Sequence, residues 1–396
     1  MSTLRVDAIR HNSATSDAIT TAADGTCTAK LTSIGGGGLS HRNIFINGAM
    51  TVAQRGVSST TNGYGSVDRF YVGNNGVDEA PTHSQADISA GTTPYTLGFR
   101  KSLKITNGNQ TSGAGAADYI FINMPQEAQN LATSGWNYKS SSSFITLSFW
   151  IKSSVAQNFF FQFDVRDGTR QNYVMETGSL TADTWTKITK VIPGNSNLTI
   201  DNDNGVGAYI TFGVFWGTNY TASMSLETWG AASDSSKTPD NTSTWYTTND
   251  ATLEFTGIQL EVGDTATSFE HRSFGDELSR CQRYFIRYGG NGAYSPIGNG
   301  FQRETTQSFI QGTFPVRMRA NPTPILTAGE GGAGPITTDR YAFDQKVTSI
   351  DGSQSRYTTT GFHMRFEHSA IGAERRPIFI CSDSNGQGTV DFTAEL

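Results

Sequence analysis

The sequence has few cysteines and no long apolar segment. Its three cysteines, Cys27, Cys281 and Cys381, lie far apart and form no C-x-x-C pair, which argues against a disulfide framework or a zinc site and suits a reducing compartment. No run of about 18 apolar residues occurs, so we expect no membrane insertion. The first seven residues contain no apolar signal core, so we expect no export.

Charge is scarce as well. Only 16% of the residues are charged, the net charge is −6, and no run of Lys or Arg occurs. Nucleic acid is therefore not expected as a partner, because nothing in the sequence could neutralise a line of phosphates. The six histidines show no metal-ligand spacing, and no P-loop, Rossmann or G-x-S-x-G motif is present, so no cofactor or reaction is indicated by these signatures.

The residues that are abundant are typical of β-structure. The 396 residues include 43 Gly, 24 Phe, 14 Tyr and 6 Trp. Glycine favours many tight turns, and the aromatic side chains are enough to fill the cores of packed sheets. Strand-length aromatic or β-branched runs are separated by turn signals such as Asp167-Gly168 and Pro193-Gly194, which predicts an all-β protein built around a jelly-roll-type β-sandwich.

Composition also divides the chain. Four glycines at 35–38 indicate a linker over 35–40, since such residues have little to pack and much freedom to lose. All six tryptophans fall within 41–274, whereas 276–396 has 12 basic and 12 acidic residues and no Trp. We therefore predict a jelly-roll domain over 41–274 and a smaller C-terminal β-sandwich over 275–396. Residues 1–34 form a separate β-rich segment, too small to fold alone; it either needs partners or is a disordered tail.

The predicted junction between the two β-domains carries the clearest local signals. Residues Gly257–Ser273 begin with a strand in which Ile258 and Leu260 alternate with polar residues. A short helix should follow, with Ser273 as N-cap and with Asp276 and Glu277 in its first turn.

This junction resembles one found in tail-fibre and virion structural (tail appendage) proteins of bacteriophages, in which a carbohydrate-module-like β-sandwich precedes a C-terminal β-domain. Four other segments resemble landmarks of the same family in the same order: Ile46–Gly56, Val67–Phe70, Ser148–Ser154 and Phe314–Pro324. The resemblance implies a homotrimeric subunit of the virion tail that is assembled in the host cytoplasm. Residues 1–34 would then attach to a tail adaptor, nozzle or baseplate protein.

The family resemblance also implies contact with a host-surface polysaccharide or receptor. Aromatic residues in the polar region 216–246 are candidates for this contact, since a ring presented from a loop can stack on a sugar while neighbouring amides bond its hydroxyls. The alternative is that these rings cap the sandwich or pack against a neighbouring subunit. The candidates are Trp216, Tyr220, Trp229, Trp245 and Tyr246.

Two further sets of residues are candidates for ion binding and for assembly. Asp201 and Asp203 alternate with amides before a glycine, as in a structural calcium loop, although an Asx-rich turn would have the same composition. Arginines around the junction either pair within the chain or contact carboxylates of neighbouring subunits. These arginines are Arg280, Arg283, Arg287, Arg317 and Arg319.

No catalytic residues are predicted. Two carboxylate pairs could serve a glycosidase, Asp164 with Asp167 and Glu254 with Glu261. However, Asp167 lies in a turn with Gly168, and Glu254 and Glu261 fit the polar face of their strand. We therefore expect a structural subunit of a phage tail fibre that binds a glycan without hydrolysing it. A purely architectural tail or capsid decoration protein is the alternative. A polysaccharide-degrading tailspike would more usually show repeating β-helix coils, which this sequence lacks.

Overall fold

A computed structural model describes residues 6–10, 12–13, 15–23, 27–29, 42–327, 336–338, 345–369 and 377–396. The predicted all-β fold is confirmed: over these residues the strands form five sheets, and the helices are short. The first sheet is antiparallel and consists of β1 (Ala8–Ile9), β2 (Ile19–Thr21) and β3 (Cys27–Ala29). The predicted linker, 35–40, lies outside the described residues.

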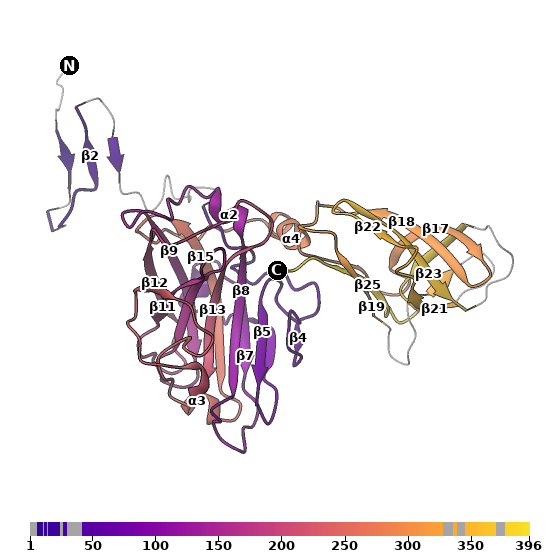
Figure 1. Cartoon of the computed structure of the whole chain (residues 1–396), viewed down its shortest axis with the longest axis horizontal. Helices are drawn as coiled ribbons and strands as arrows, with labels where there is room; N and C mark the ends of the chain where they lie inside the picture. The colour runs from indigo at the N-terminus through magenta and orange to yellow at the C-terminus, as the bar shows by residue number, and fades with distance from the viewer. Residues whose placement is uncertain are drawn as a thin grey trace.

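The large domain is a sandwich of two six-stranded antiparallel sheets (Figure 1). One, which we call the groove sheet, has the order β14-β11-β10-β13-β8-β5. Its strands are β5 (Tyr71–Asn75), β8 (Tyr119–Glu127), β10 (Phe160–Val165), β11 (Gln171–Glu176), β13 (Val206–Trp216) and β14 (Trp229–Ala231). The opposing sheet, in the order β12-β9-β15-β7-β6-β4, contains β4 (Ser58–Ser59), β6 (Thr82–Asp87), β7 (Lys101–Thr106), β9 (Phe144–Ser153), β12 (Thr186–Pro193) and β15 (Thr252–Val262).

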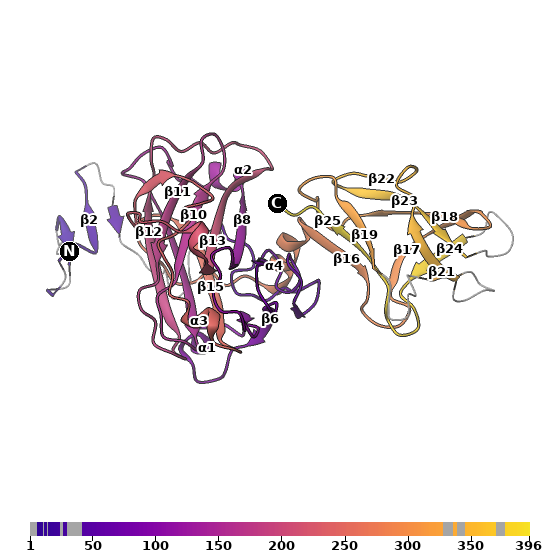
Figure 2. The same ribbon diagram turned by 60° about the horizontal axis from the view of Figure 1, so that its bottom comes forward.

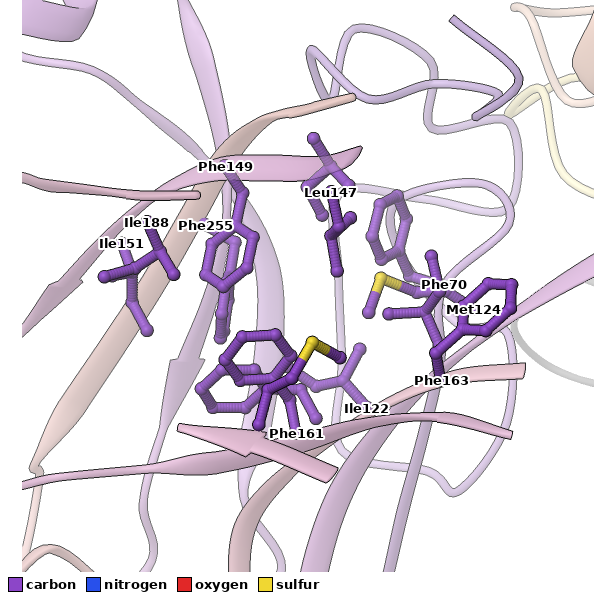
Figure 3. Close-up of a cluster of buried hydrophobic side chains, with 14 of the residues drawn as sticks. Phe70, Ile122, Met124, Leu147, Phe149, Ile151, Phe161, Phe163, Ile188 and Phe255 are labelled. Carbon is purple, nitrogen blue, oxygen red and sulfur yellow. The ribbon is translucent and has the colours of Figure 1, made fainter. Parts of the chain in front are cut away.

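The two sheets are held together by the side chains on their facing surfaces. Successive residues of a strand point to opposite faces, so Ile122 of β8 and Phe161 and Phe163 of β10 enter the core (Figure 3). Phe161 meets Phe149 of the opposing sheet edge to face, with ring centroids 5.3 Å apart. Each fully buried ring of this kind stabilises the fold by about 1.5–3 kcal/mol.

The C-terminal domain has a separate core. Its three-stranded sheet contains β16 (Phe285–Gly289), β19 (Thr323–Thr327) and β25 (Thr389–Thr393). The C-terminal domain lies to one side of the sandwich in both views (Figures 1 and 2). In its second sheet β18 also pairs with β23, so that the strands close into a ring. This sheet contains β17 (Pro296–Glu304), β18 (Gln307–Thr313), β20 (Ile336–Thr338), β21 (Gln345–Ile350), β22 (Arg356–Tyr357), β23 (Gly361–His368) and β24 (Pro377–Cys381).

The predicted junction helix is present as α4 (Phe274–Gln282). The Ser273 hydroxyl accepts a hydrogen bond from the Asp276 amide at 3.2 Å, and Glu277 and Cys281 face inward. The other helical segments are single turns: α1 (Thr93–Thr96), α2 (Ala128–Ala132), η1 (Thr218–Tyr220) and α3 (Thr244–Thr247). In the described part of the chain, no helix has the length and apolar character needed to cross a membrane.

Segments that are far apart in the sequence meet at the junction between the two β-domains. Asn47, with a positive φ of 62°, donates from its side chain to the carbonyls of Val52 and Asp68, and from its backbone to the Glu277 carboxylate. The next residue must be glycine, because a Cβ on Gly48 would lie 2.0 Å from the Ile258 oxygen. The segments 46–56, 67–70 and 257–285 are thus joined at one place.

Buried charges connect the two β-domains at this junction. Glu395 accepts from Arg55 at 3.1 Å and also pairs with Arg69, while the Arg69 guanidinium lies 3.5 Å from the centre of the Tyr284 ring. Glu127, at the end of β8, accepts from Tyr284 at 2.6 Å and from Arg283 at 3.0 and 2.5 Å. Because a buried charge is costly unless it is paired, these contacts fix how the C-terminal domain sits against the sandwich.

Burial and hydrogen bonding act in opposite directions on the junction carboxylates. Desolvation raises the pKa of Asp68 to about 6, even though Arg55 and Gln54 oppose the shift. At Glu127, desolvation also acts to raise the pKa, but the hydrogen bonds from Arg283 and Tyr284 outweigh it and the net pKa is lowered. The junction therefore contains one carboxyl that binds its proton more tightly in the folded state and one that binds it less tightly.

The cap of helix α4 provides a test of the junction. The Ser273→Ala variant should lose about 1 kcal/mol of unfolding free energy, because the Asp276 amide loses its acceptor. Ser279→Ala is the control: its exposed hydroxyl donates only to the Gly275 carbonyl in the same helix. Urea unfolding of both variants and the wild type measures the difference. Equal stability of the two variants would contradict the capping role.

Asp68 predicts a pH dependence of stability. Its folded pKa of about 6 lies above its ordinary value of 3.8, so the folded state holds the proton more tightly. The resulting stabilisation is present below about pH 4 and is lost as the pH rises through about 6, by roughly 3 kcal/mol in total. The Asp68→Asn variant cannot titrate, so its advantage over the wild type should grow across this window.

The measurement is the unfolding free energy of wild type and Asp68→Asn at intervals from pH 4 to pH 7. Asp264→Asn controls for the change in net charge, since Asp264 is an exposed residue whose side chain bonds the adjacent Thr265. If wild type and Asp68→Asn show the same pH dependence, Asp68 is not the titrating group.

Candidate binding groove on the large domain

The outer face of the groove sheet carries a cleft of about 320 Å³. It follows from strand alternation: on β8 the residues between the core positions Ile120, Ile122 and Met124 face outward. The same alternation on β10 and β13 adds outward side chains to the floor. The residues that line this groove are Tyr119, Phe121, Asn123, Gln162, Asp164, Arg166, Arg170, Tyr209, Thr211, Trp216, Tyr220, Asp234 and Lys237.

Aromatic rings form one wall of the groove. Phe121 and Trp216 are stacked, with centroids 5.3 Å apart and planes at 11°. Tyr119 packs on Trp216 at 5.4 Å and meets Tyr220 edge to face at 5.3 Å. Lys237 lies 5.5 Å from the centre of the Trp216 ring. Because Tyr119 and Tyr220 are half-buried against the more deeply placed rings, their exposed surfaces are held in position before any ligand arrives.

Polar side chains form the floor. One oxygen of Asp164, Oδ2, accepts from Arg166 at 2.9 Å and from Arg170 at 2.8 Å. Asn123 accepts from Thr211 at 3.0 Å. Burial acts to lower the pKa of Arg170, but its hydrogen bond to Asp164 and the negative charge there raise the pKa overall, so the guanidinium stays charged.

Within the described part of the chain, two atoms of this floor have no hydrogen-bond partner. The Oδ1 atom of Asp164 and the Nε atom of Arg170 are both buried and unpaired, and the Asp164 side chain is only 4% exposed. Unpaired buried polar atoms are uncommon in folded proteins and call for an explanation. Neither atom is open to solvent, whereas the side chains of Arg166 and Arg170 are 32% and 27% exposed and can bond hydroxyls of a ligand in the groove.

The structure places two of the five predicted aromatic residues in the groove. Trp216 and Tyr220 line it, although Trp216 is almost fully buried by its neighbours. Trp229 on β14 lies elsewhere: its indole nitrogen donates to the Pro193 carbonyl at 2.7 Å, and its ring packs on Tyr173. It is partly buried against the core of the large domain.

The prediction was wrong for Trp245 and Tyr246, which are buried in the core. Trp245 is 0% exposed and donates to the Thr252 carbonyl at 3.1 Å, while Tyr246 stacks on Phe215 at 4.3 Å. Both lie in the single turn of α3, which points two successive rings inward while its polar neighbours face the solvent. Polar flanking residues therefore gave no information about the direction of these rings.

Three of the five predicted assembly arginines bond within the chain. Arg283 pairs with Glu127; Arg287 makes two hydrogen bonds to Asp391, at 2.8 and 2.7 Å; and Arg319 donates to backbone carbonyls on both sides of the junction. Arg280 and Arg317 instead line a cleft beside α4. For these two, the contact with a neighbouring subunit stays a prediction.

The candidate calcium residues lie in an exposed loop. Asp203 accepts from the Gly205 amide at 2.8 Å, as in an Asx-turn, and the Asp201 amide donates to Asp167 at 2.9 Å. Within the described residues, no group of three or more His, Cys, Asp or Glu is arranged to hold a metal ion. Calcium at Asp201 and Asp203 stays a prediction that would need backbone oxygens to complete the ligand set.

The carboxylates of the second pair, Glu254 and Glu261, make hydrogen bonds and ion pairs within the opposing sheet and its neighbouring loops. Glu254 pairs with Lys152 at 2.9 Å and accepts from Ser102 at 2.9 Å. Glu261 accepts from Thr267 at 2.6 Å and lies 3.5 Å from Arg42. Both carboxylates belong to the opposing sheet, so neither reaches the groove.

Most of the groove was not predicted from the sequence. Tyr119, Phe121, Gln162, Asp164 and Tyr209 lie within strands whose apolar content suggested only a core. A signal was present in 159–165, where Gln162 and Asp164 interrupt a run of phenylalanines at alternate positions. Two polar residues at alternate positions of a strand indicate that one of its faces meets solvent, but they do not identify the neighbouring strands that form the rest of that surface.

Comparisons with known proteins add a weak similarity of fold. The chain matches no protein-family model and no curated protein. The enzymatically active domain of tailspike protein 4 of bacteriophage CBA120 is similar over 57% of this chain and 22% of that chain, with 10% identity and a TM-score of 0.32. A Bacteroides thetaiotaomicron protein described as sugar-binding covers 56% of this chain and 100% of its own, with 11% identity and a TM-score of 0.31.

A third solved structure is the family 11 carbohydrate-binding module of a Clostridium thermocellum cellulosomal cellulase. It covers 54% of this chain and 98% of its own length, with 14% identity and a TM-score of 0.25. The chain thus spans about a fifth of the tailspike and nearly all of the two smaller proteins. At these identities and TM-scores the similarities assign neither a family nor a function.

Proposed function

We propose that this chain is a subunit of a phage tail appendage whose large domain binds a host-surface glycan in the groove, without hydrolysing it. The observation that carries the binding role is one cleft that has an aromatic wall beside a floor of polar and charged side chains. The assignment to a phage tail rests on the five sequence segments that resemble the tail-fibre family.

The two sides of the groove match the two kinds of surface on a sugar. The C–H face of a pyranose ring is apolar and stacks on Tyr119 and Tyr220, whose rings are already fixed by Trp216. Adjacent hydroxyls then reach the floor, where the guanidinium groups of Arg166 and Arg170 can donate hydrogen bonds and the Asn123 amide can donate or accept them. An apolar ligand would cover these polar groups without bonding them, so the floor favours a polyhydroxylated ligand.

The arrangement of carboxylates supports binding rather than catalysis. A glycosidase needs two carboxyl groups that face each other across the scissile bond, about 5–9.5 Å apart. Of the two aspartates that line the groove, Asp164 is bonded by two arginines and Asp234 by Lys237 and Arg170. Both side chains are thus held by cations, and we expect no release of reducing ends from a bound polysaccharide.

Affinity at a single groove of this size is expected to be modest, so the proposal includes a trimer. The sheet β1-β2-β3 has strands of two or three residues, which cannot bury a core of their own and so require partners. Three chains joined there, and held by a tail adaptor, nozzle or baseplate protein, would present three grooves to one cell. Binding then gains from effective concentration without any new contact.

Removal of the aromatic wall tests the binding site. Tyr119→Ala/Tyr220→Ala should weaken glycan binding about tenfold to a hundredfold, because two stacking contacts are lost. Trp185→Ala is the matched control: this half-exposed ring lies beside Lys152 of the opposing sheet, with the ammonium 5.2 Å from its centre. Wild type and variants are applied to an array of purified bacterial surface polysaccharides. The dissociation constant of each polysaccharide that binds wild type is then measured by calorimetry.

A wild-type chain that binds no polysaccharide would favour the architectural alternative, in which the chain serves assembly alone. If the Trp185→Ala control loses as much binding as Tyr119→Ala/Tyr220→Ala, the groove is not the binding site. Circular dichroism of each variant ensures that lost binding is not lost folding.

The trimer is tested by sedimentation equilibrium. The expected species has three times the 42.7 kDa mass of one chain. Deletion of residues 1–34 should reduce it to a single chain if the N-terminal segment holds the trimer together. A species that stays at 42.7 kDa at high protein concentration contradicts the proposal.

A further inference from the structure

The C-terminal domain exposes two large aromatic side chains on one face of its ring of strands. Phe301 on β17 is 52% exposed and Phe379 on β24 is 61% exposed. Their neighbours along each strand, Gln302, Ile378 and Ile380, are buried inside the ring. Because side chains alternate along a strand, both phenylalanines lie on the outer surface. Exposing apolar rings of this size to water is unfavourable.

The strand register arranges these rings among polar residues in two parallel rows. In the first row, Phe301 pairs with Phe309 of β18. In the second, two residues along each strand, Phe379 pairs with Asn299, Asn299 with Gln311, and Gln311 with His363 of β23. Because neighbouring strands lie about 4.8 Å apart, the second row extends roughly 14 Å across the sheet.

A hollow of about 240 Å³ lies between the two rows. Phe301 and Phe309 line it, with ring centroids 5.8 Å apart. The imidazole of His363 is stacked on Phe309 at 4.8 Å with planes at 8°. The hollow is smaller than the roughly 300–1,000 Å³ of sites for drug-sized ligands, so it suits a single ring.

The polar side chains around the hollow are available to a ligand. Asn299, Gln311 and His363 are exposed, and within the described residues their side chains make no hydrogen bond or ion pair. Each offers donors or acceptors of the kind that bond sugar hydroxyls: two amides and one imidazole. The hollow therefore has aromatic rings beside unused hydrogen-bonding groups, with no carboxylate among the residues that line it.

The exposed apolar area of this face is suited to a small ligand and is too small for a stable interface with a second copy of the chain. Two half-exposed phenylalanines offer on the order of 200–300 Å² of apolar area, whereas a stable interface buries about 800 Å² on each partner. We infer that this face, formed by Phe301, Phe309, Phe379, Asn299, Gln311 and His363, is a second glycan-binding site, which takes one pyranose ring of a bacterial surface polysaccharide.

The closed ring of strands keeps this site in shape. Inward side chains such as Ile310, Met364 and Ile378 fill the core behind it. Strands β17 and β18 approach so closely that a Cβ on Gly300 would lie 1.8 Å from the Phe309 oxygen. The face is thus a rigid surface, and ordering it on binding costs little. The site does not depend on the groove, since it lies in the other domain and has its own residues.

The experiment uses the full chain and the same array of purified bacterial polysaccharides. The patch variant is Phe301→Ala/Phe379→Ala, and the groove variant is Tyr119→Ala/Tyr220→Ala. The control is Phe274→Ala, which removes a ring that is also 61% exposed but lies at the start of α4. We expect the patch variant to bind at least one polysaccharide about tenfold more weakly than wild type and the control. We also expect the groove variant to retain this patch-dependent binding.

The outcomes separate the two sites. If the groove variant loses binding to every polysaccharide and the patch variant to none, the second site is refuted while the groove stands. If only the patch variant loses binding, the groove proposal fails and the second site stands. Wild type that binds no polysaccharide overturns both. Sedimentation in which the patch variant alone dissociates to single chains would show that this face is a subunit interface and not a glycan site.

Discussion

Buried charges at the junction between the two β-domains constrain the whole molecule. Glu127, at the end of a sandwich strand, accepts hydrogen bonds from Arg283 and Tyr284, which follow the junction helix. Glu395 of the C-terminal domain pairs with Arg55 and Arg69 of the sandwich. A buried charge that lost its partner would cost several kcal/mol, so each domain must be folded correctly for the other to be placed. The junction thus sets where the second face lies relative to the groove.

Both proposed binding surfaces arise from the same property of β-strands. In the groove sheet and in the C-terminal ring, one side of each strand fills a core with Phe, Ile and Met, and the other side is left for aromatic and amide side chains. The proposed surfaces therefore cost the fold little, because they lie on the opposite face of each strand from the side chains that fill the core. The price appears locally, as unpaired atoms at Asp164 and Arg170 and as exposed rings at Phe301 and Phe379.

Sequence reasoning succeeded where the signal is local. The helix at 274–282 with Ser273 as its cap depends on residues within one turn, and the all-β fold depends on composition and short-range alternation. It failed for Trp245 and Tyr246, because whether a ring points inward depends on the element packed beneath it. It missed Tyr119, and it weighed Asp164 only as a catalytic carboxylate, for the same reason: the two residues share a groove only once β8, β13 and β10 are hydrogen-bonded neighbours.

The sequence by itself determined the class of fold, the junction helix and, through its alternating strands, which residues could share a face. The order of strands decided the rest. Only the tertiary structure brings residues from β8, β10 and β13 into one groove, closes β18 onto β23, and pairs Glu127 with Arg283 across 156 positions of chain. The physical reason is that strand pairing and buried ion pairs are long-range contacts, whose partners no local pattern of residues identifies.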